Sequence, residues 1–393
     1  MPGVYEYISA YGDRTFRERP FSDADNLVLC QLIYLPIEQV VSPDLAAAPV
    51  PFADMANAYF QKQGCRHRRM GLLLTKQASI NMMRMAQTPR FSALRVVGAQ
   101  SVFSETPALQ YGVATFLLPD GTAVVTFRGT DDSLTGWHED LDIFIQRGMQ
   151  SYPLAQQYLK DVAAQFPGDI IVCGHSKGGN IALYAALTAD KQIRDRIRCV
   201  YNNEGPGFCD YSLYHTGVYD ELLERYRHLV PHASFIGMFL AHDYDYTVVE
   251  NKHQFGPLQH DITYWQIRDG ELVTRDELNV LGRFSDVLLS NLIFRLNEDD
   301  CPVLNEITER LMDGAQVDCL LEAVKKLPVV AVHVLQAWLQ TPKDTRALFR
   351  KTLHGVTHIT IQTAKNFKRD TVPQAAAAAK ILLRKVQRST VVS

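Results

Sequence analysis

The feature that most constrains the fold of this chain is a serine bracketed by glycines directly after a short apolar run. Ile170-Ile-Val-Cys173 leads into Gly174-His175-Ser176-Lys177-Gly178, and a helical pattern follows to Thr188. A wholly apolar run of four residues is typical of a strand in a parallel sheet that is covered on both faces. A strand, a glycine turn with a central serine and a helix are the context of a nucleophile elbow. The alternative is a structural glycine turn around a buried serine.

Predicted strands and helices alternate around this motif. Helices are predicted at 24–34, 51–63, 76–87, 151–165 and 178–188, and strands at 91–99, 110–118, 122–127, 170–173 and 198–202. The turn signal Pro119-Asp120-Gly121 makes 110–127 a hairpin or a pair of adjacent strands. This alternation predicts an α/β protein with a mostly parallel central sheet, and with the elbow it predicts the α/β-hydrolase fold.

The pattern changes near residue 275, after which helical periodicity dominates. We therefore predict two domains, residues 1–275 and a helical C-terminal region of residues 276–393. From Lys343 to the end there are eleven Lys and Arg against Asp344 and Asp370, a charge of +9, so the net charge of -3 leaves -12 for the rest. Such a tail is either a solvated helix face or a surface for an anionic membrane or an acidic partner.

Composition excludes several classes of protein. Hydrophobic residues make up 47% and charged residues 21%, which is ordinary for a soluble globular chain, and the net charge does not indicate a nucleic-acid partner. Seven scattered cysteines without a CxxC motif predict neither disulfides nor zinc. The polar N-terminus and the lack of a long apolar run predict a cytoplasmic protein. No phosphate-loop, dinucleotide or HExxH motif occurs, so we expect no cofactor and no metal. The oligomeric state is not predicted.

A second motif, Phe127-Arg128-Gly129-Thr130, also ends an apolar run. A turn at the carboxyl end of a strand can aim a backbone N–H and a hydroxyl at one point, so Thr130 is a candidate donor to an oxyanion. The N–H of Lys177 is the second candidate, because the residue after the nucleophile usually supplies one. The alternative is a polar loop in which Arg128 forms an ion pair.

These motifs carry a resemblance. FRGT followed by Trp137, Asp140-Leu141 and the elbow is similar to the class 3 (fungal-type) lipases. A fuller set resembles a bacterial family of lipase-like α/β hydrolases of unassigned function over residues 23–275. It comprises QLIYL, GHSKGGNIALYAA, Asn202-Asn203-Glu204-Gly205-Pro206-Gly207-Phe208, the stretch 230–238, and Leu258-Gln259-His260-Asp261 with Trp265. The resemblance implies an ester of a lipid or another acyl compound as substrate.

A catalytic triad of this fold needs an acid and a histidine after the serine. The resemblance places the family histidine at His260. The rival histidines downstream of the serine are His215, His228, His232, His242 and His253. Each rival is more often a surface or hydrogen-bonded residue than a catalyst.

The acid is less obvious. Class 3 lipases carry an Asp just before a Val-Pro pair, but here His228-Leu229 precede Val230-Pro231, so the usual acid is missing. We predict Asp245, then Asp243, in the turn before an apolar strand at 246–249, where an acid can still orient the His260 imidazole. The alternative for both is a turn-forming Asp. Asp261 is excluded because adjacent side chains of an extended segment point apart.

The sequence thus predicts a serine hydrolase that cleaves carboxylic esters through Ser176, His260 and an Asp, with an acyl-enzyme intermediate. Lys177 is also expected to add positive charge that suits an anionic headgroup. The alternative is a catalytically silent scaffold or binding protein on the same fold, including one that binds a membrane peripherally. The missing Asp favours this alternative, whereas the intact Ser176 and His260 favour the enzyme.

Overall fold

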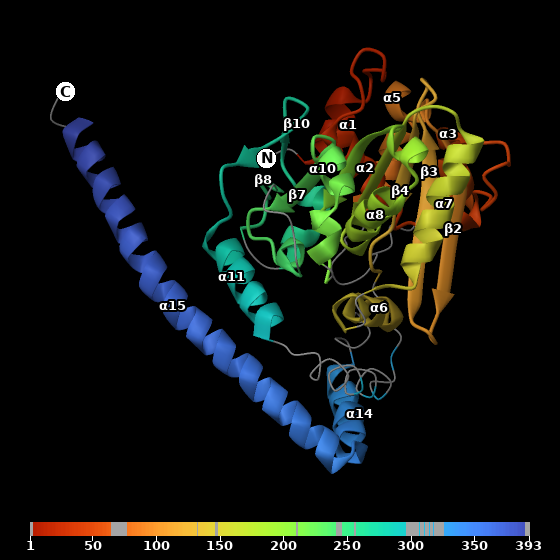
Figure 1. The fold of residues 1–393 in the computed structure, drawn as a ribbon. Coiled ribbons are helices and arrows are strands. Elements are labelled where there is room, and N and C mark those ends of the chain that lie inside the picture. The colour runs from red at the N-terminus through yellow and green to blue at the C-terminus, as the bar shows by residue number, and fades with distance from the viewer. Residues whose placement is uncertain are drawn as a thin grey trace.

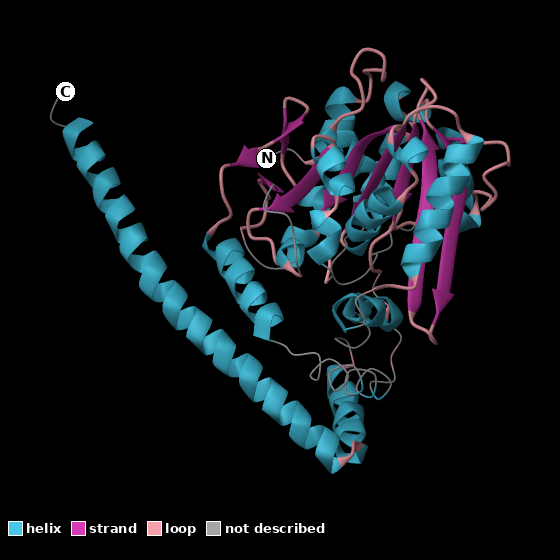
Figure 2. Ribbon diagram, in the orientation of Figure 1, coloured by secondary structure: helices cyan, strands magenta, loops and turns pink. Residues whose placement is uncertain are grey.

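The computed structural model describes residues 3–63, 77–131, 133–145, 148–209, 211–240, 246–254, 257–295, 306, 310, 314, 317 and 326–389. A large sheet with helices on both faces forms the main body, and a long helix extends away from it towards the C-terminus (Figure 1). Figure 2 shows the same arrangement coloured by secondary structure.

The sheet has nine strands in the order β1-β2-β3-β4-β5-β6-β7-β8-β11. Its bounds are β1 Val50–Pro51, β2 Arg95–Ser104, β3 Leu109–Leu117, β4 Ala123–Phe127, β5 Ile170–His175, β6 Ile197–Asn203, β7 Tyr226–Pro231, β8 Tyr246–Val249 and β11 Thr274–Arg275. Strands β4 to β8 are parallel, and the flanking pairs are antiparallel. The predicted α/β-hydrolase fold is confirmed. The sheet is mixed, and the predicted parallel direction holds for its central strands β4 to β8.

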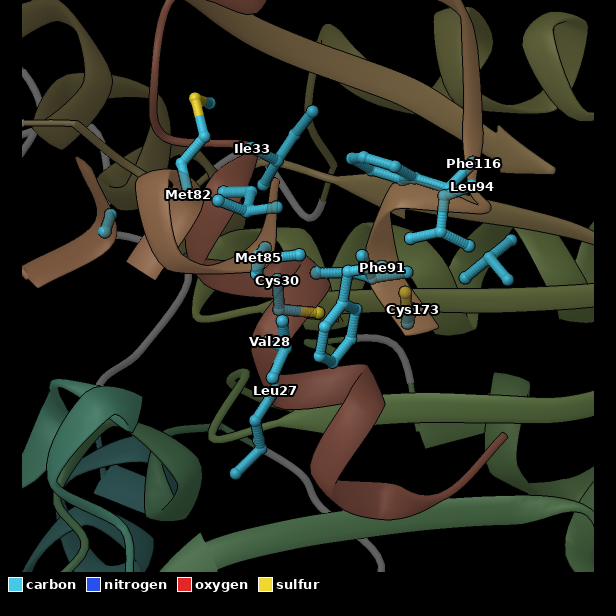
Figure 3. Close-up of a cluster of buried hydrophobic side chains, with 14 of the residues drawn as sticks. Leu27, Val28, Cys30, Ile33, Met82, Met85, Phe91, Leu94, Phe116 and Cys173 are labelled. Atoms are coloured by element: carbon cyan, nitrogen blue, oxygen red, sulfur yellow. The ribbon is translucent and has the colours of Figure 1, made fainter. Parts of the chain in front are cut away.

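Helices cover both faces of the sheet. One face carries α1 Val4–Tyr11, α2 Asp23–Leu32, α3 Phe52–Gln63, α4 Gln77–Met85 and α5 Pro89–Ser92; the other carries α7 Ser151–Gln165, α8 Lys177–Thr188 and α10 Gly217–Leu223. Cys173 packs with the first group, which includes Leu27 and Phe91 (Figure 3), whereas Val172 packs with the second. Both faces of β5 are therefore buried, which is why its sequence is wholly apolar.

The remaining elements are short or lie at the edges. They are α6 Leu134–Ile145, α9 Lys191–Arg194, β9 Ile267–Arg268, β10 Glu271–Leu272, η1 Ile37–Gln39, η2 Tyr211–His215, η3 Ile236–Met238, η4 Pro257–His260 and η5 Ile262–Tyr264. Strands β9 and β10 form a separate two-stranded sheet. Helix α6 and strand β7 were not predicted from the sequence. Strand β7 was missed because the polar Arg227 and His228 interrupt its apolar pattern.

The five predicted helices up to residue 188 are confirmed, and 110–127 is an antiparallel hairpin of β3 and β4. The strand predicted at 91–99 is wrong in its first part. Helix α5 occupies 89–92, and β2 begins at Arg95. Pro89 at the first turn of α5 explains the difference, because its fixed φ favours a helix start.

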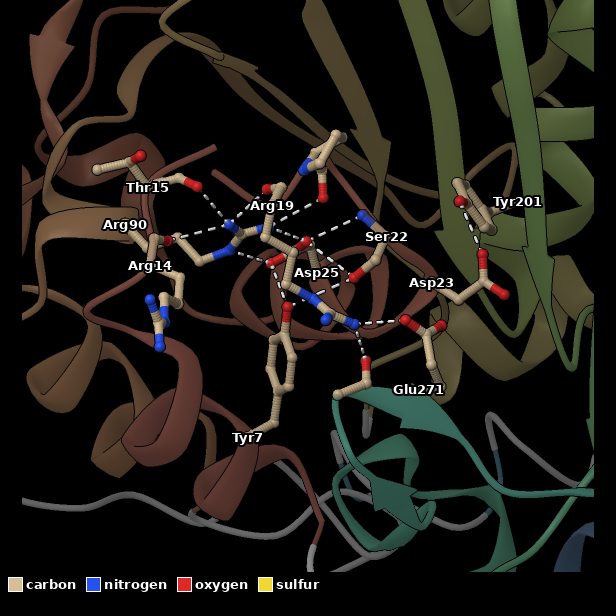
Figure 4. A network of polar contacts seen from close by, with 12 residues as sticks. Tyr7, Arg14, Thr15, Arg19, Ser22, Asp23, Asp25, Arg90, Tyr201 and Glu271 are labelled. Carbon is tan, nitrogen blue, oxygen red and sulfur yellow. Dashed lines mark hydrogen bonds and ion pairs between the residues drawn. The ribbon is translucent and has the colours of Figure 1, made fainter. Parts of the chain in front are cut away.

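A buried ion pair fixes three N-terminal helices to one another. Arg90 Nε donates to Asp25 Oδ1 at 2.8 Å, and both side chains are inaccessible to solvent. Tyr7 adds a hydrogen bond of 3.0 Å to Asp25, and the guanidinium also donates to the carbonyls of Arg14 and Arg19 (Figure 4). Because these partners compensate both buried charges, the pair holds α1, α2 and α5 in one arrangement.

The C-terminal region contains α11 Val280–Arg295, α14 Leu327–Gln340 and α15 Lys343–Ser389. Phe284 of α11 packs on Phe367 of α15, and Trp338 of α14 packs on Phe349, each with ring centroids 5.5 Å apart. Most of residues 296–325, which belong to the region of predicted helical periodicity after 275, lie outside the described residues. Among the described helices, none has the length and apolar character needed to span a bilayer. The domain boundary near 275 stays a prediction.

Candidate active site

Ser176 lies at a sharp turn between β5 and α8. Its backbone has φ 58° and ψ -135°, a left-handed conformation that is strained for a residue with a side chain. A side chain at Gly174 would put its Cβ 2.0 Å from the carbonyl oxygen of Gly178, so only glycine permits the close passage of strand and helix. The Ser176 N–H donates to the Asn203 carbonyl at 2.9 Å. The local geometry is that of a nucleophile elbow.

His260 lies at the end of η4 and contacts a carboxylate. Its Nδ1 is 2.9 Å from Glu204 Oε2, and the two side chains are 9% and 2% exposed. Because a carboxylate accepts hydrogen bonds, Nδ1 carries the proton and Nε2 is left as the acceptor nitrogen. The other Glu204 oxygen accepts a hydrogen bond of 2.7 Å from Ser234 Oγ.

Glu204 is a residue that the sequence analysis did not assign to the site. It follows β6 with φ 51°, directly after Asn203, whose carbonyl accepts from Ser176. Its position at the carboxyl end of a strand beside β5 was a signal for a site residue, since ligand sites of α/β sheets form at that edge. The predicted acids Asp243 and Asp245 lie outside the described residues. Asp261 accepts from the backbone and hydroxyl of Thr263, so it caps η5.

A second histidine joins the elbow to His260. His175 Nε2 is 2.8 Å from the His260 carbonyl oxygen, and His175 Nδ1 is 2.8 Å from the Tyr34 hydroxyl. The rings of His175 and His260 pack with centroids 4.5 Å apart. Burial lowers the pKa of His175 well below its usual value, and the neighbouring His260 lowers it further, so His175 is neutral.

The loop with Thr130 packs directly on the elbow. A Cβ at Gly129 would lie 3.0 Å from Ser176 Cβ and 2.3 Å from the Tyr34 hydroxyl, so glycine is required there. The Thr130 hydroxyl lies 2.7 and 2.6 Å from the two carboxyl oxygens of Asp140. Burial raises the pKa of Asp140 to about 6, partly offset by the charge of Lys177 and the hydrogen bond from Thr130.

Lys177 is the first residue of α8, where backbone N–H groups have no acceptor within the helix. Its side chain is 1% exposed, and Nζ lies 2.8 Å from Glu139 Oε2 and 2.8 Å from the Gln110 carbonyl. The expectation that the Lys177 side chain offers positive charge to a substrate is therefore wrong, because Glu139 neutralises it and the protein covers it. Of the groups of Lys177, only the backbone N–H remains a candidate hydrogen-bond donor to the oxyanion.

Metal ligation was not expected, and it stays untested. Within the described part of the chain, no group of three or more His, Cys, Asp or Glu side chains is arranged to hold a metal ion.

Comparison with known proteins identifies a matching family and two similar structures. A family model described as Mbeg1-like matches residues 85–304. One similar solved structure, described by the words "an unusual buried polar cluster in a family of fungal lipases", is 13% identical in sequence to this chain. The match covers 66% of this chain and 89% of the other, with a TM-score of 0.37. A second is the Rhizomucor miehei lipase in complex with its propeptide, which is 14% identical to this chain. The match covers 66% of this chain and 76% of the lipase, with a TM-score of 0.35. No curated protein matches this chain.

Proposed function

The chain belongs to the Mbeg1-like family, and we propose that it is a serine hydrolase that cleaves carboxylic esters, including lipid or other acyl esters. Ser176 is the nucleophile, His260 the general base and Glu204 the acid. The hydrogen bond between His260 Nδ1 and Glu204 Oε2 carries this proposal, because it presents Nε2 as the proton acceptor. We assign the acid to Glu204 in preference to Asp245 and Asp243 on the same observation.

In the proposed reaction, His260 Nε2 takes the Ser176 hydroxyl proton as the oxygen attacks the ester carbonyl. The backbone N–H groups of Thr130 and Lys177 stabilise the oxyanion, and the protonated His260 donates its proton to the leaving alcohol. Water, activated by His260, then releases the acid from the acyl-enzyme. Glu204 holds the imidazole in the required tautomer and stabilises its charged form.

The test is labelling with a fluorophosphonate probe, which reacts with activated serines, beside hydrolysis of short- and long-chain p-nitrophenyl esters. Wild type should be labelled, Ser176→Ala should not, and His260→Ala should label far more slowly. A folded wild-type protein that takes no label and cleaves no ester would favour the silent scaffold instead. Folding of each variant is checked by thermal unfolding.

A specific observation also favours peripheral membrane contact by the C-terminal helices. Helix α14 contains no Asp, Glu, Lys or Arg, and one side of it carries four aliphatic residues that are 53–60% exposed: Val329, Val332, Leu335 and Leu339. An exposed apolar stripe of this kind marks an interaction surface. At fourteen residues α14 is too short to span a bilayer.

Helix α15 supplies the matching charge. Lys343, Arg350, Lys351 and Lys365 are exposed and fall on the side of the helix away from Phe349 and Phe367, at 100° per residue. Between Asp344 and Asp370 the helix has no acidic residue. An apolar stripe beside a basic helix suits the interface of a membrane with anionic lipids. The free Cys30, Cys173 and Cys199 suit the proposal of a cytoplasmic location.

Vesicles of phosphatidylcholine, with and without phosphatidylserine, test this contact. Binding should require the anionic lipid, weaken at high salt, and be lost in Val332→Ser with Leu335→Ser. Leu223→Ser, at a less exposed apolar position of α10 outside the C-terminal helices, is the control. Equal binding by the two variants, or no binding by wild type, would refute the contact without touching the hydrolase proposal.

A further inference from the structure

The end of α2 reaches the elbow from a part of the chain outside the family match at 85–304. Tyr34, two residues beyond α2, is buried, and its hydroxyl lies 2.8 Å from His175 Nδ1. His175 is the residue before the proposed nucleophile, and its Nε2 lies 2.8 Å from the carbonyl oxygen of His260. Two hydrogen bonds thus connect the N-terminal layer of helices to the backbone of the proposed base.

The direction of each hydrogen bond follows from the chemistry of the groups. A backbone carbonyl only accepts, so His175 Nε2 carries the ring proton. In a neutral imidazole the other nitrogen is then an acceptor, so the Tyr34 hydroxyl donates to Nδ1. Burial raises the pKa of Tyr34 well above its usual value, which keeps this donor protonated. The tautomer of His175 is therefore fixed from both sides.

These bonds lie where water does not compete. Tyr34 is 5% exposed and His175 is inaccessible, so each hydrogen bond is stronger than it would be in water. The close approach of Gly129 to the Tyr34 hydroxyl also places the Thr130 loop against the same group. One phenol therefore lies in contact with the loop of the proposed oxyanion donor and with the histidine beside the nucleophile.

We propose that Tyr34 and His175 are positioning residues that hold the backbone of His260, and through it the imidazole, in line with Ser176. This inference rests on the proposed hydrolase function for its catalytic consequence. Neither side chain touches the reacting atoms in this role. Because small misplacements of a catalytic group reduce turnover strongly, loss of the Tyr34 hydroxyl should reduce kcat by about 10- to 100-fold and leave KM near its wild-type value.

The decisive variant is Tyr34→Phe, which keeps the ring and removes only the hydroxyl. The matched control is Tyr201→Phe, which removes a hydrogen bond of 2.9 Å from a phenol to Asp23, on the same helix α2 (Figure 4). Tyr201→Phe should keep the wild-type kcat, although it should change the free energy of unfolding by about as much as Tyr34→Phe does. Equal losses of kcat in both variants would make Tyr34 a structural residue only and overturn the proposal.

A second measurement separates this inference from the hydrolase proposal. Nitrogen-15 NMR of the histidine side chains should show His175 neutral and protonated on Nε2 in wild type, and the Nδ1 resonance should move in Tyr34→Phe. This result does not depend on activity, so it supports the hydrogen-bonded arrangement even in a protein that hydrolyses no ester. Protonation of His175 on Nδ1, or an unchanged Nδ1 resonance in the variant, would overturn it.

Discussion

Polar side chains lie inside the protein around Ser176, whereas aliphatic side chains lie on the surface of α14. His175 is inaccessible and Lys177 is 1% exposed, but Leu335 and Leu339 are 55% and 60% exposed. Buried polar groups need partners, and the side chains of His175, Lys177 and His260 are each held by hydrogen bonds that fix their neighbours. Exposed aliphatic groups contribute little to folding. Substitutions should therefore change rate or stability in the first region and only association in the second.

The largest expected effect is on catalysis, at Glu204. Glu204→Gln removes the carboxylate that orients His260 and should reduce kcat by about 10³- to 10⁴-fold, because the imidazole loses its tautomer and its stabilising charge. Asp245→Asn and Asp243→Asn should retain kcat near the wild-type value. Steady-state ester hydrolysis measures all three. A large loss in either Asp variant, with Glu204→Gln active, would return the acid to the residues first predicted.

The next effect is on stability, at Lys177. Lys177→Met leaves the buried Glu139 carboxylate without its cation and should lower the free energy of unfolding by about 3–5 kcal/mol. Lys160→Met removes an exposed pair with Asp190, 3.5 Å apart, and should change it by less than about 1 kcal/mol. Chemical denaturation compares the two. Similar changes in the free energy of unfolding for the two variants would show that the buried Lys177–Glu139 pair contributes no more to stability than an exposed ion pair.

A smaller, pH-dependent effect is expected at Asp140. Its pKa is raised to about 6 in the fold, above the value of an unfolded Asp, so its ionisation disfavours folding as the pH rises from about 4 to 6. Asp140→Asn should stabilise the protein by about 3 kcal/mol above pH 6 and keep the Thr130 contact. The difference should vanish below pH 4. Unfolding curves across this range test it, and a difference independent of pH would contradict the assignment.

The smallest effect on folding is expected in α14. Val332→Ser with Leu335→Ser should change the free energy of unfolding by less than about 0.5 kcal/mol, because both side chains are already exposed. The same double variant is the one expected to lose vesicle binding. A destabilisation as large as that of Lys177→Met would show that the stripe is packed within the folded protein, and the contrast between the two regions would fail.

Much of the fold was predictable because its signals are local. The apolar strand β5, the glycines of the elbow and the periodicity of α8 each follow from neighbouring residues, so the fold class, the turn that carries Ser176 and most helices were predicted from sequence. The start of β2 was mispredicted because Pro89 favours a helix there. The hairpin of β3 and β4 was predicted because a turn signal separates two apolar runs.

By itself, the sequence determined where a nucleophile elbow forms, because close passage of strand and helix depends on Gly174 and Gly178. Only the tertiary structure decided which groups surround Ser176. Glu204 meets His260 across 56 residues, and Tyr34 meets His175 across 141. Hydrogen bonds over such separations depend on the order and register of whole strands, which no local pattern records. From sequence, a Glu before Gly-Pro-Gly at the end of a strand fits a plain turn and a site residue equally well, and the contact with His260 decides between them.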